Sequence, residues 1–132
     1  MSRPASEDQI VTWAGTPFLP LYPHDGRLFH VPGLYAFVSR DASGARTLLW
    51  ADQSDCIARA ARIGHPLWRA AVGQGFNELH LCLRAGERID RLQLLARIVR
   101  HEPPRLGADA AATLTPWRPA DLVIERRSVR LG

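Results

Sequence analysis

The chain has 132 residues, 46% of them hydrophobic and 23% charged, which is the size and balance of one globular domain with its own core. No apolar run reaches the roughly 18 residues that a membrane-spanning helix needs, so no membrane partner is expected. Residues 1–8 carry acids and no apolar stretch, so no signal peptide is predicted and a cytoplasmic protein is expected.

The net charge is +4, and all 17 basic residues are arginine. A GC-rich, bacterial-type genome favours arginine codons, which is the stronger explanation. Arginine also suits phosphate recognition, because its planar guanidinium binds oxyanions through paired hydrogen bonds. The charge therefore permits an anionic partner without requiring one.

Cysteines and histidines do not predict a metal site. Cys56 and Cys82 lack the spacing of metal ligands, and in a reducing compartment we expect free, buried thiols. The five histidines show no ligand spacing either: His24, His30, His65, His80 and His101. No cofactor is expected from these residues.

The N-terminal part, residues 1–32, is predicted to be an extension that packs on the domain. Its apolar side chains between residues 11 and 33 are interrupted by Pro17, Pro20, Pro23 and Pro32. Proline is excluded from the interior of long helices and from central strands, so we predict an irregular segment with one short strand.

Two strands follow. Residues 33–39 and 46–51 are rich in β-branched and aromatic residues, and the turn at residues 41–44 predicts that they form a hairpin. Ser54 or Asp55 then supplies the cap of a helix over residues 56–63.

The second half contains a short helix, a strand and a long helix. Pro66 precedes a helix over residues 67–72, and residues 78–84 alternate in the manner of a strand. Residues 87–101 place apolar side chains at helical spacing, and Pro103-Pro104 ends that helix. Residues 108–132 are assigned to a C-terminal extension that includes a strand over residues 121–131. This order predicts an α/β fold in which helices pack on a three-stranded sheet.

The ordered set of residues resembles the GIY-YIG nuclease domain over residues 33–107. The resemblance is carried by Gly33-Leu34-Tyr35, Gln53-Ser54-Asp55, His65 and Pro104-Arg105-Leu106, together with the order of the elements. It implies a small three-stranded antiparallel sheet flanked by helices. It also implies cleavage of DNA phosphodiester bonds with one divalent metal, in which an arginine and the metal offset the charge of the phosphate.

Residue by residue, the resemblance leaves the active site incomplete. Tyr35 keeps the first tyrosine, but Trp50-Ala51-Asp52 stands where the family has Tyr-Ile-Gly, and the acid would repel a phosphate. Arg59 matches the helix arginine in a register shifted by one residue. Leu95 stands at the position of the metal-binding glutamate, and Gly107 at that of the asparagine.

Three hypotheses follow. The first is a GIY-YIG-like domain that lacks nuclease activity and binds DNA, RNA or a protein, with Arg59, Arg62, His65 and Arg69 as the nucleic-acid-binding residues. The alternative is a divergent endonuclease that cuts DNA with Tyr35, Arg59, Mg²⁺ or Mn²⁺ and an acid recruited from elsewhere, such as Asp52 or Glu87. The third is a structural subunit without a nucleic-acid role.

Each of these residues also has a structural interpretation. Tyr35 is favoured as a packing residue on the sheet, and Trp50 and Trp68 are favoured as core residues over base-stacking platforms. For Arg59, Arg62 and Arg69, a phosphate-binding face and an ordinary solvated helix face are equally favoured.

Overall fold

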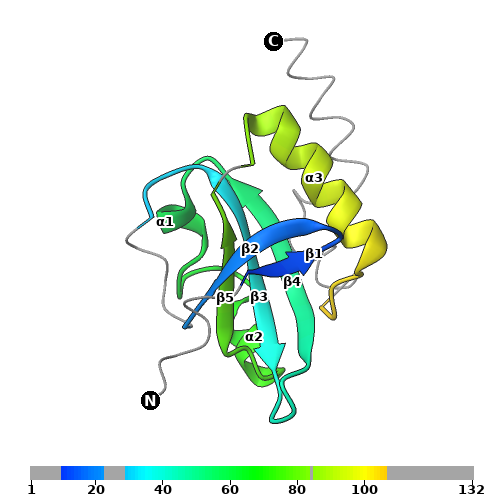
Figure 1. Ribbon diagram of the computed structural model, residues 1–132. Helices are drawn as coiled ribbons and strands as arrows, with labels where there is room; N and C mark the ends of the chain where they lie inside the picture. The colour runs from blue at the N-terminus through cyan, green and yellow to red at the C-terminus, as the bar shows by residue number, and fades with distance from the viewer. Residues whose placement is uncertain (1–9, 23–28, 84, 107–132) are drawn as a thin grey trace, which may run out of the picture.

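The computed structural model describes residues 10–22, 29–83 and 85–106 (Figure 1). They form five strands and three helices. All strand pairs are antiparallel, and the order across the sheet is β1-β2-β5-β3-β4. The strands are β1 (Val11–Trp13), β2 (Thr16–Leu21), β3 (Gly33–Arg40), β4 (Arg46–Ser54) and β5 (Glu78–Cys82), and the helices are α1 (Ile57–Ala60), α2 (Trp68–Gly73) and α3 (Arg88–His101).

The predicted fold class is wrong. Instead of a three-stranded sheet flanked by helices, the protein has a five-stranded antiparallel sheet that curves into a half-barrel, with three short helices, and is mostly β. The difference lies at the N-terminus, where the prolines predicted an irregular segment. That segment supplies β1 and β2, which add to the free side of β5.

The two prolines of β2 are tolerated because this strand changes partner along its length. Residues 16–18 pair with β1, whereas residues 19–21 pair with β5. Pro17 and Pro20 therefore each have one neighbouring strand rather than two. A proline, which has no N–H to donate, fits a strand position with one open side.

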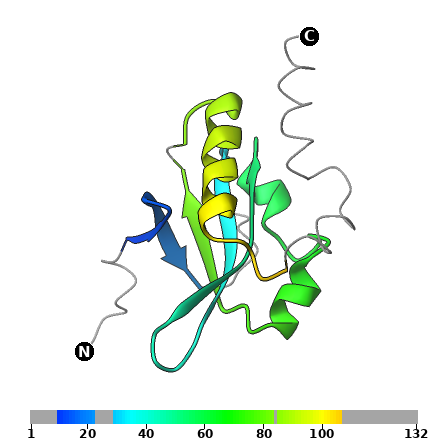
Figure 2. The same cartoon turned by 90° about the vertical axis from the view of Figure 1, so that its right-hand side faces the viewer.

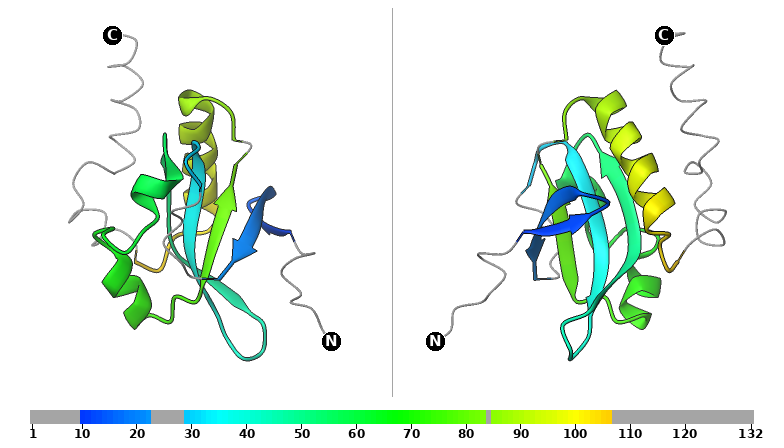
Figure 3. Two further views of the ribbon diagram at one scale, coloured as in Figure 1. Left: turned by 90° about the vertical axis from the view of Figure 1, so that its left-hand side faces the viewer. Right: turned by 45° about the vertical axis from the view of Figure 1, so that its right-hand side comes forward.

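The central strand β3 separates two apolar layers, because successive side chains of a strand point to opposite faces. Tyr35 and Phe37 face α1 and α2. Leu34, Ala36 and Val38 face α3 and Trp13. Figures 2 and 3 show α3 on one side of the sheet and α1 with α2 on the other.

The predicted hairpin of residues 33–39 and 46–51 is confirmed, and β4 continues to Ser54 because it keeps pairing with β3 up to Gly33. Gly33 has a steric reason to be glycine. A Cβ at this position would lie 2.6 Å from the carbonyl oxygen of Cys82 on β5, which is too close for any side chain. The predicted helix over residues 56–63 is shorter than expected, since the backbone leaves the helical conformation at Ala61.

The long helix α3 is confirmed and begins with a capping box in which the side chains of Glu87 and Asp90 each accept a backbone N–H. It buries Leu92, Leu95 and Ile98 against the sheet. After it, the backbone N–H groups of Arg105 and Leu106 donate to carbonyl oxygens of β4 at 2.8 and 3.0 Å. The strand predicted over residues 121–131 lies outside the described residues. None of the described helices combines the length and apolar character needed to cross a bilayer.

Candidate functional site

Residues 56–77, called the basic segment, make up all but the first residue of the connection from β4 to β5, and contain three arginines and no acid. The first residue of the connection, Asp55, pairs with Arg91 of α3. Helices α1 and α2 lie in this segment and pack on the sheet through Ile57, Ala61, Leu67 and Ala71. Ala58 and Phe76 of the segment are buried as well, whereas its arginines lie on the outer side. Arg59, Arg62 and Arg69 are consequently all exposed.

The three arginines have no ion-pair partner among the described residues, whereas arginines elsewhere on the sheet do. Arg40 and Arg46 both contact Glu78, at 3.5 and 2.7 Å. The positive charge of the basic segment is therefore not balanced by neighbouring carboxylates in the described part of the chain, and it is available to an anion.

A shallow depression of about 480 Å³ lies on the basic segment, lined by Ile63, His65, Pro66, Trp68, Arg69 and Val72. Trp68 is half-buried and stacks edge-to-face on Phe37 and Phe76, with ring centroids 5.6 and 5.0 Å apart. The depression thus combines an indole, an arginine and exposed aliphatic side chains.

Tyr35 and His65 meet below this surface. The hydroxyl oxygen of Tyr35 lies 3.0 Å from Nε2 of His65, and Nδ1 of the same ring accepts the backbone N–H of Leu67 at 2.9 Å. Because Nδ1 accepts, a neutral ring carries its proton on Nε2 and donates it to Tyr35. Both ring nitrogens are therefore engaged within the protein.

Burial keeps this pair neutral. It lowers the pKa of His65 from 6.5 to about 4, so the imidazole carries no charge at neutral pH. Burial, together with the nearby carboxylate of Asp52, raises the pKa of the Tyr35 hydroxyl well above its usual value. Tyr35 is only 2% exposed, so its hydroxyl is not presented to solvent.

Asp52 lies across from Tyr35 in the β3–β4 pairing. Burial raises the pKa of its carboxyl from 3.8 to about 7, even though the carboxyl accepts the backbone N–H of Gln53 at 2.7 Å. In its ionised form, this carboxyl disfavours a phosphate beside Tyr35.

The structure separates the remaining positions of the expected nuclease site. Leu95 is fully buried among residues on the α3 face of the sheet, whereas Tyr35 faces α1 and α2. No hydrogen bond or ion pair joins Arg59 to Tyr35 within the described residues, and Gly107 lies outside them. Residues 10–22, 29–83 and 85–106 contain no group of three or more histidines, cysteines or acids that could hold a metal ion. Trp50 is 1% exposed and belongs to the core, as favoured.

A second polar cluster was not anticipated from the sequence. The indole N–H of Trp13 donates to Nδ1 of the fully buried His80 at 3.0 Å, and Nε2 of His80 lies 2.9 Å from Glu78. Arg46 donates to the same carboxylate at 2.7 Å. Glu78 and His80 share a strand face because they are two residues apart, but their partners come from distant parts of the chain. Both ring nitrogens of His80 are therefore engaged within the protein.

Comparison of the chain with protein-family models, with curated proteins and with solved structures finds no match to any of them.

Proposed function

We propose that this protein is a nucleic-acid-binding module that contacts phosphate groups through the basic segment and does not hydrolyse them. The proposal depends on one observation above all: Arg59, Arg62 and Arg69 are exposed on a segment without acids and have no ion-pair partner among the described residues. Phosphate is the polyanion that the arginine fork fits best. A cytoplasmic location and descent from a GIY-YIG-like ancestor are parts of the same proposal.

The chemistry of the surface favours an anionic chain over a single ion. Several guanidinium groups spread along a segment match the repeated charge of a nucleic-acid backbone. Trp68 offers a half-exposed indole beside Arg69, a combination that stacks on bases. His65 is neutral and bonded on both ring nitrogens, so its role in the proposal is to position the loop that precedes α2.

The test compares two double variants that remove the same charge. Arg59→Ala with Arg62→Ala should weaken binding of a labelled oligonucleotide about tenfold, because two phosphate contacts are lost. The slope of log affinity against log salt should fall by about 1.4 to 1.8, the contribution of two contacts. Fluorescence anisotropy at several salt concentrations measures both quantities.

Arg100→Ala with Arg105→Ala is the matched control, because both side chains are exposed outside the basic segment. We expect this control to change affinity only slightly. Equal effects of the two double variants would contradict the proposed surface, since net charge alone would then explain the binding. Binding that does not weaken with salt would contradict phosphate contacts altogether.

A divergent endonuclease is the second candidate, and the Tyr35–His65 hydrogen bond is the observation that favours it. The bond joins two residues that the resemblance matches to the nuclease motif, but Nε2 of His65 carries the proton and so does not take one from the Tyr35 hydroxyl in this arrangement. The burial of that hydroxyl and the position of Leu95 on the other face favour binding without cleavage. Nicking of supercoiled plasmid with Mg²⁺ or Mn²⁺ that disappears in Tyr35→Phe would establish the nuclease and overturn the non-hydrolytic proposal.

The first hypothesis also includes a protein as the binding partner. If neither single-stranded nor duplex oligonucleotides bind at low salt, the exposed arginines would instead serve an acidic protein surface. The variants of Arg59 and Arg62 would then alter that complex rather than nucleic-acid binding.

A further inference from the structure

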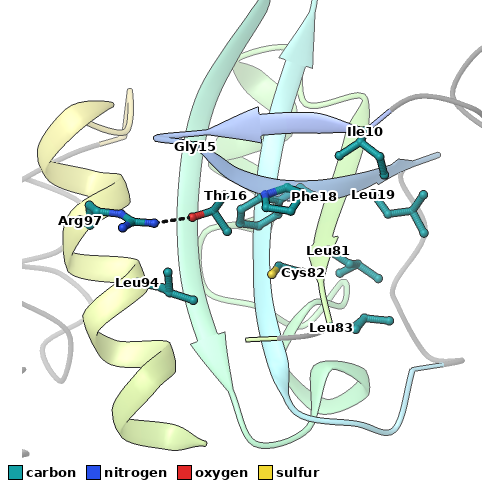
Figure 4. Close-up of a pocket in the computed structure, with 11 residues that line it drawn as sticks. Ile10, Gly15, Thr16, Phe18, Leu19, Leu81, Cys82, Leu83, Leu94 and Arg97 are labelled. Carbon is teal, nitrogen blue, oxygen red and sulfur yellow. Dashed lines mark hydrogen bonds between the residues drawn. The ribbon is translucent and has the colours of Figure 1, made fainter. Parts of the chain in front are cut away.

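A second hollow lies on the other side of the molecule from the basic segment, and it has a different chemistry. It encloses about 610 Å³ between β2, β5 and α3, within the range of small-molecule sites (Figure 4). We call it the α3 groove. The α3 groove shares no residue with the basic segment, so a ligand there would bind at a site separate from the proposed nucleic-acid surface.

The α3 groove exists because β2 leaves β5. Only residues 19–21 of β2 pair with β5, from Leu19 opposite Leu81 to Leu21 opposite Leu79. From Phe18 back towards its start, β2 pairs with β1 instead. The end of β5 at Cys82 therefore lies beside a gap that no described strand fills. Leu94 of α3 lines the opposite side of this gap.

The lining is polar at one end and apolar along the rest. Figure 4 shows Arg97 and Thr16 together at one end, while Leu19 and Leu83 lie at the other. Nη2 of Arg97 donates to the hydroxyl of Thr16 at 3.0 Å, which holds the guanidinium at the Thr16 end of the groove. The described lining residues include this one cation and no acid.

We propose that the α3 groove binds a small amphipathic monocarboxylate, with its carboxylate on Arg97 and its hydrocarbon chain along Phe18, Leu83 and Leu94. Burial of a hydrocarbon chain supplies most of the affinity, at about 0.8 kcal/mol for each CH₂ group removed from water. The guanidinium supplies orientation and selects an anionic head, because its N–H groups that bond no described residue match the two oxygens of a carboxylate.

The polarity gradient favours this ligand over other occupants. An apolar peptide segment without an acid would leave Arg97 without an anion. A cationic amphiphile with its head at the polar end would place its positive charge beside that of Arg97. A free monocarboxylate satisfies both ends of the groove with one molecule.

Decanoate is a suitable probe, and the side-chain methyl groups of the groove report its binding. Titration of the full chain, below the concentration at which decanoate forms micelles, should give saturable NMR shifts of the methyl groups of Leu83, Leu94 and Ile10. Decanol has the same chain without the charge, so it should shift the same methyl groups with lower affinity.

Two charge-matched variants locate the carboxylate. Arg97→Gln should weaken decanoate binding about threefold to fivefold, the size expected for an exposed ion pair, and leave decanol binding unchanged. Arg100→Gln removes the same charge from the same helix outside the groove lining, and should change neither. Leu94→Trp, which fills the groove, should abolish binding of both probes while the rest of the methyl spectrum shows a folded protein.

Each alternative has its own signature. Shifts that never saturate, or that fall on methyl groups outside the groove, would overturn the proposal. Equal weakening by Arg97→Gln and Arg100→Gln would also overturn it, since the charge would then act at long range. Shifts of the groove methyl groups with protein concentration alone would show that a second copy of the chain occupies the groove.

Discussion

At the scale of single residues, Asp52 shows how a buried carboxyl in the sheet makes stability depend on pH. Its folded-state pKa of about 7 lies above the unfolded value of 3.8, so the folded state holds the proton more tightly. The stability that this provides is complete below pH 3.8 and is lost as the pH rises through 7. Above that pH the sheet contains a buried carboxylate, which destabilises it.

We therefore predict that Asp52→Asn raises the free energy of unfolding at pH 8 and has almost no effect at pH 4. The full shift corresponds to at most about 4 kcal/mol, and because Asp52 is partly exposed we expect about 2 kcal/mol. His65 changes the free energy of unfolding with pH in the opposite direction. Because its pKa is lowered in the folded state, stability falls as the pH drops from 6.5 towards 4. Urea denaturation of variant and parent at each pH isolates Asp52.

Asp41 is a control for Asp52, because its pKa is shifted in the opposite direction. Hydrogen bonds from Ser43 and Ala45 lower the pKa of this exposed carboxyl, so its contribution is present at neutral pH and lost as the pH falls. Asp41→Asn should reduce stability at pH 8 and have less effect in acid. A stabilisation by Asp52→Asn that is the same at pH 4 and pH 8 would show that burial of charge is not its cause.

At the scale of elements, Arg91 fastens the start of α3 to the end of β4. This 3% exposed side chain donates to Gln53 at 3.0 Å, to the carbonyl oxygen of Gly86 at 3.1 Å and to Asp55. The sequence predicts α3 from its helical spacing but not this contact, because Gln53 and Asp55 lie far away in the chain. Arg91 falls among the polar positions of the helix, where exposure is the ordinary expectation.

Arg91→Met is predicted to lower the free energy of unfolding by about 3 kcal/mol. Methionine keeps the aliphatic stem packed but leaves the amide of Gln53 and the carbonyl of Gly86 without their donor. Asp55 is largely exposed and regains water, so it adds little to the loss. Urea denaturation gives the difference, and Arg100→Met, an exposed change on the same helix, should cost less than about 0.5 kcal/mol. A similar loss in both variants would mean that helix propensity, not the anchoring of α3, is what the substitution disturbs.

At the scale of the whole molecule, local sequence patterns predict the elements that are determined by residues close together in the chain. The β3–β4 hairpin, β5 and α3 follow from alternation, helical spacing and turn residues, and all of them are present. Strands β1 and β2 could not be predicted in this way, because the rule that excludes proline from central strands holds only when a strand has two neighbours throughout. The change of partner along β2 is a property of the folded sheet.

The same limit applies to the candidate site. The exposure of Arg59, Arg62 and Arg69 can be predicted from the sequence, since exposure on a short amphipathic segment is a local property. The contact between Tyr35 and His65 joins residues 30 positions apart, and the separation of Tyr35 from Leu95 depends on which face of the sheet each residue occupies. A spacing-based comparison cannot determine either of these relations.

The sheet order yields a prediction about the folding unit, which the sequence placed at residues 33–107. A chain that begins at residue 23 lacks β1 and β2, and with them the buried side chains of Trp13 and Phe18. Loss of one large buried aromatic side chain costs about 3–5 kcal/mol, and small domains have only about 5–15 kcal/mol in total. The shortened chain would also expose the edge of β5 and leave His80 without the N–H of Trp13.

We expect the chain that begins at residue 23 to lose cooperative unfolding and to aggregate, whereas a chain that begins at residue 10 should unfold cooperatively. Thermal unfolding by circular dichroism, with size-exclusion chromatography, distinguishes the two. Equal unfolding midpoints would mean that β1 and β2 add nothing to the stability of the sheet and that the folding unit begins near residue 33.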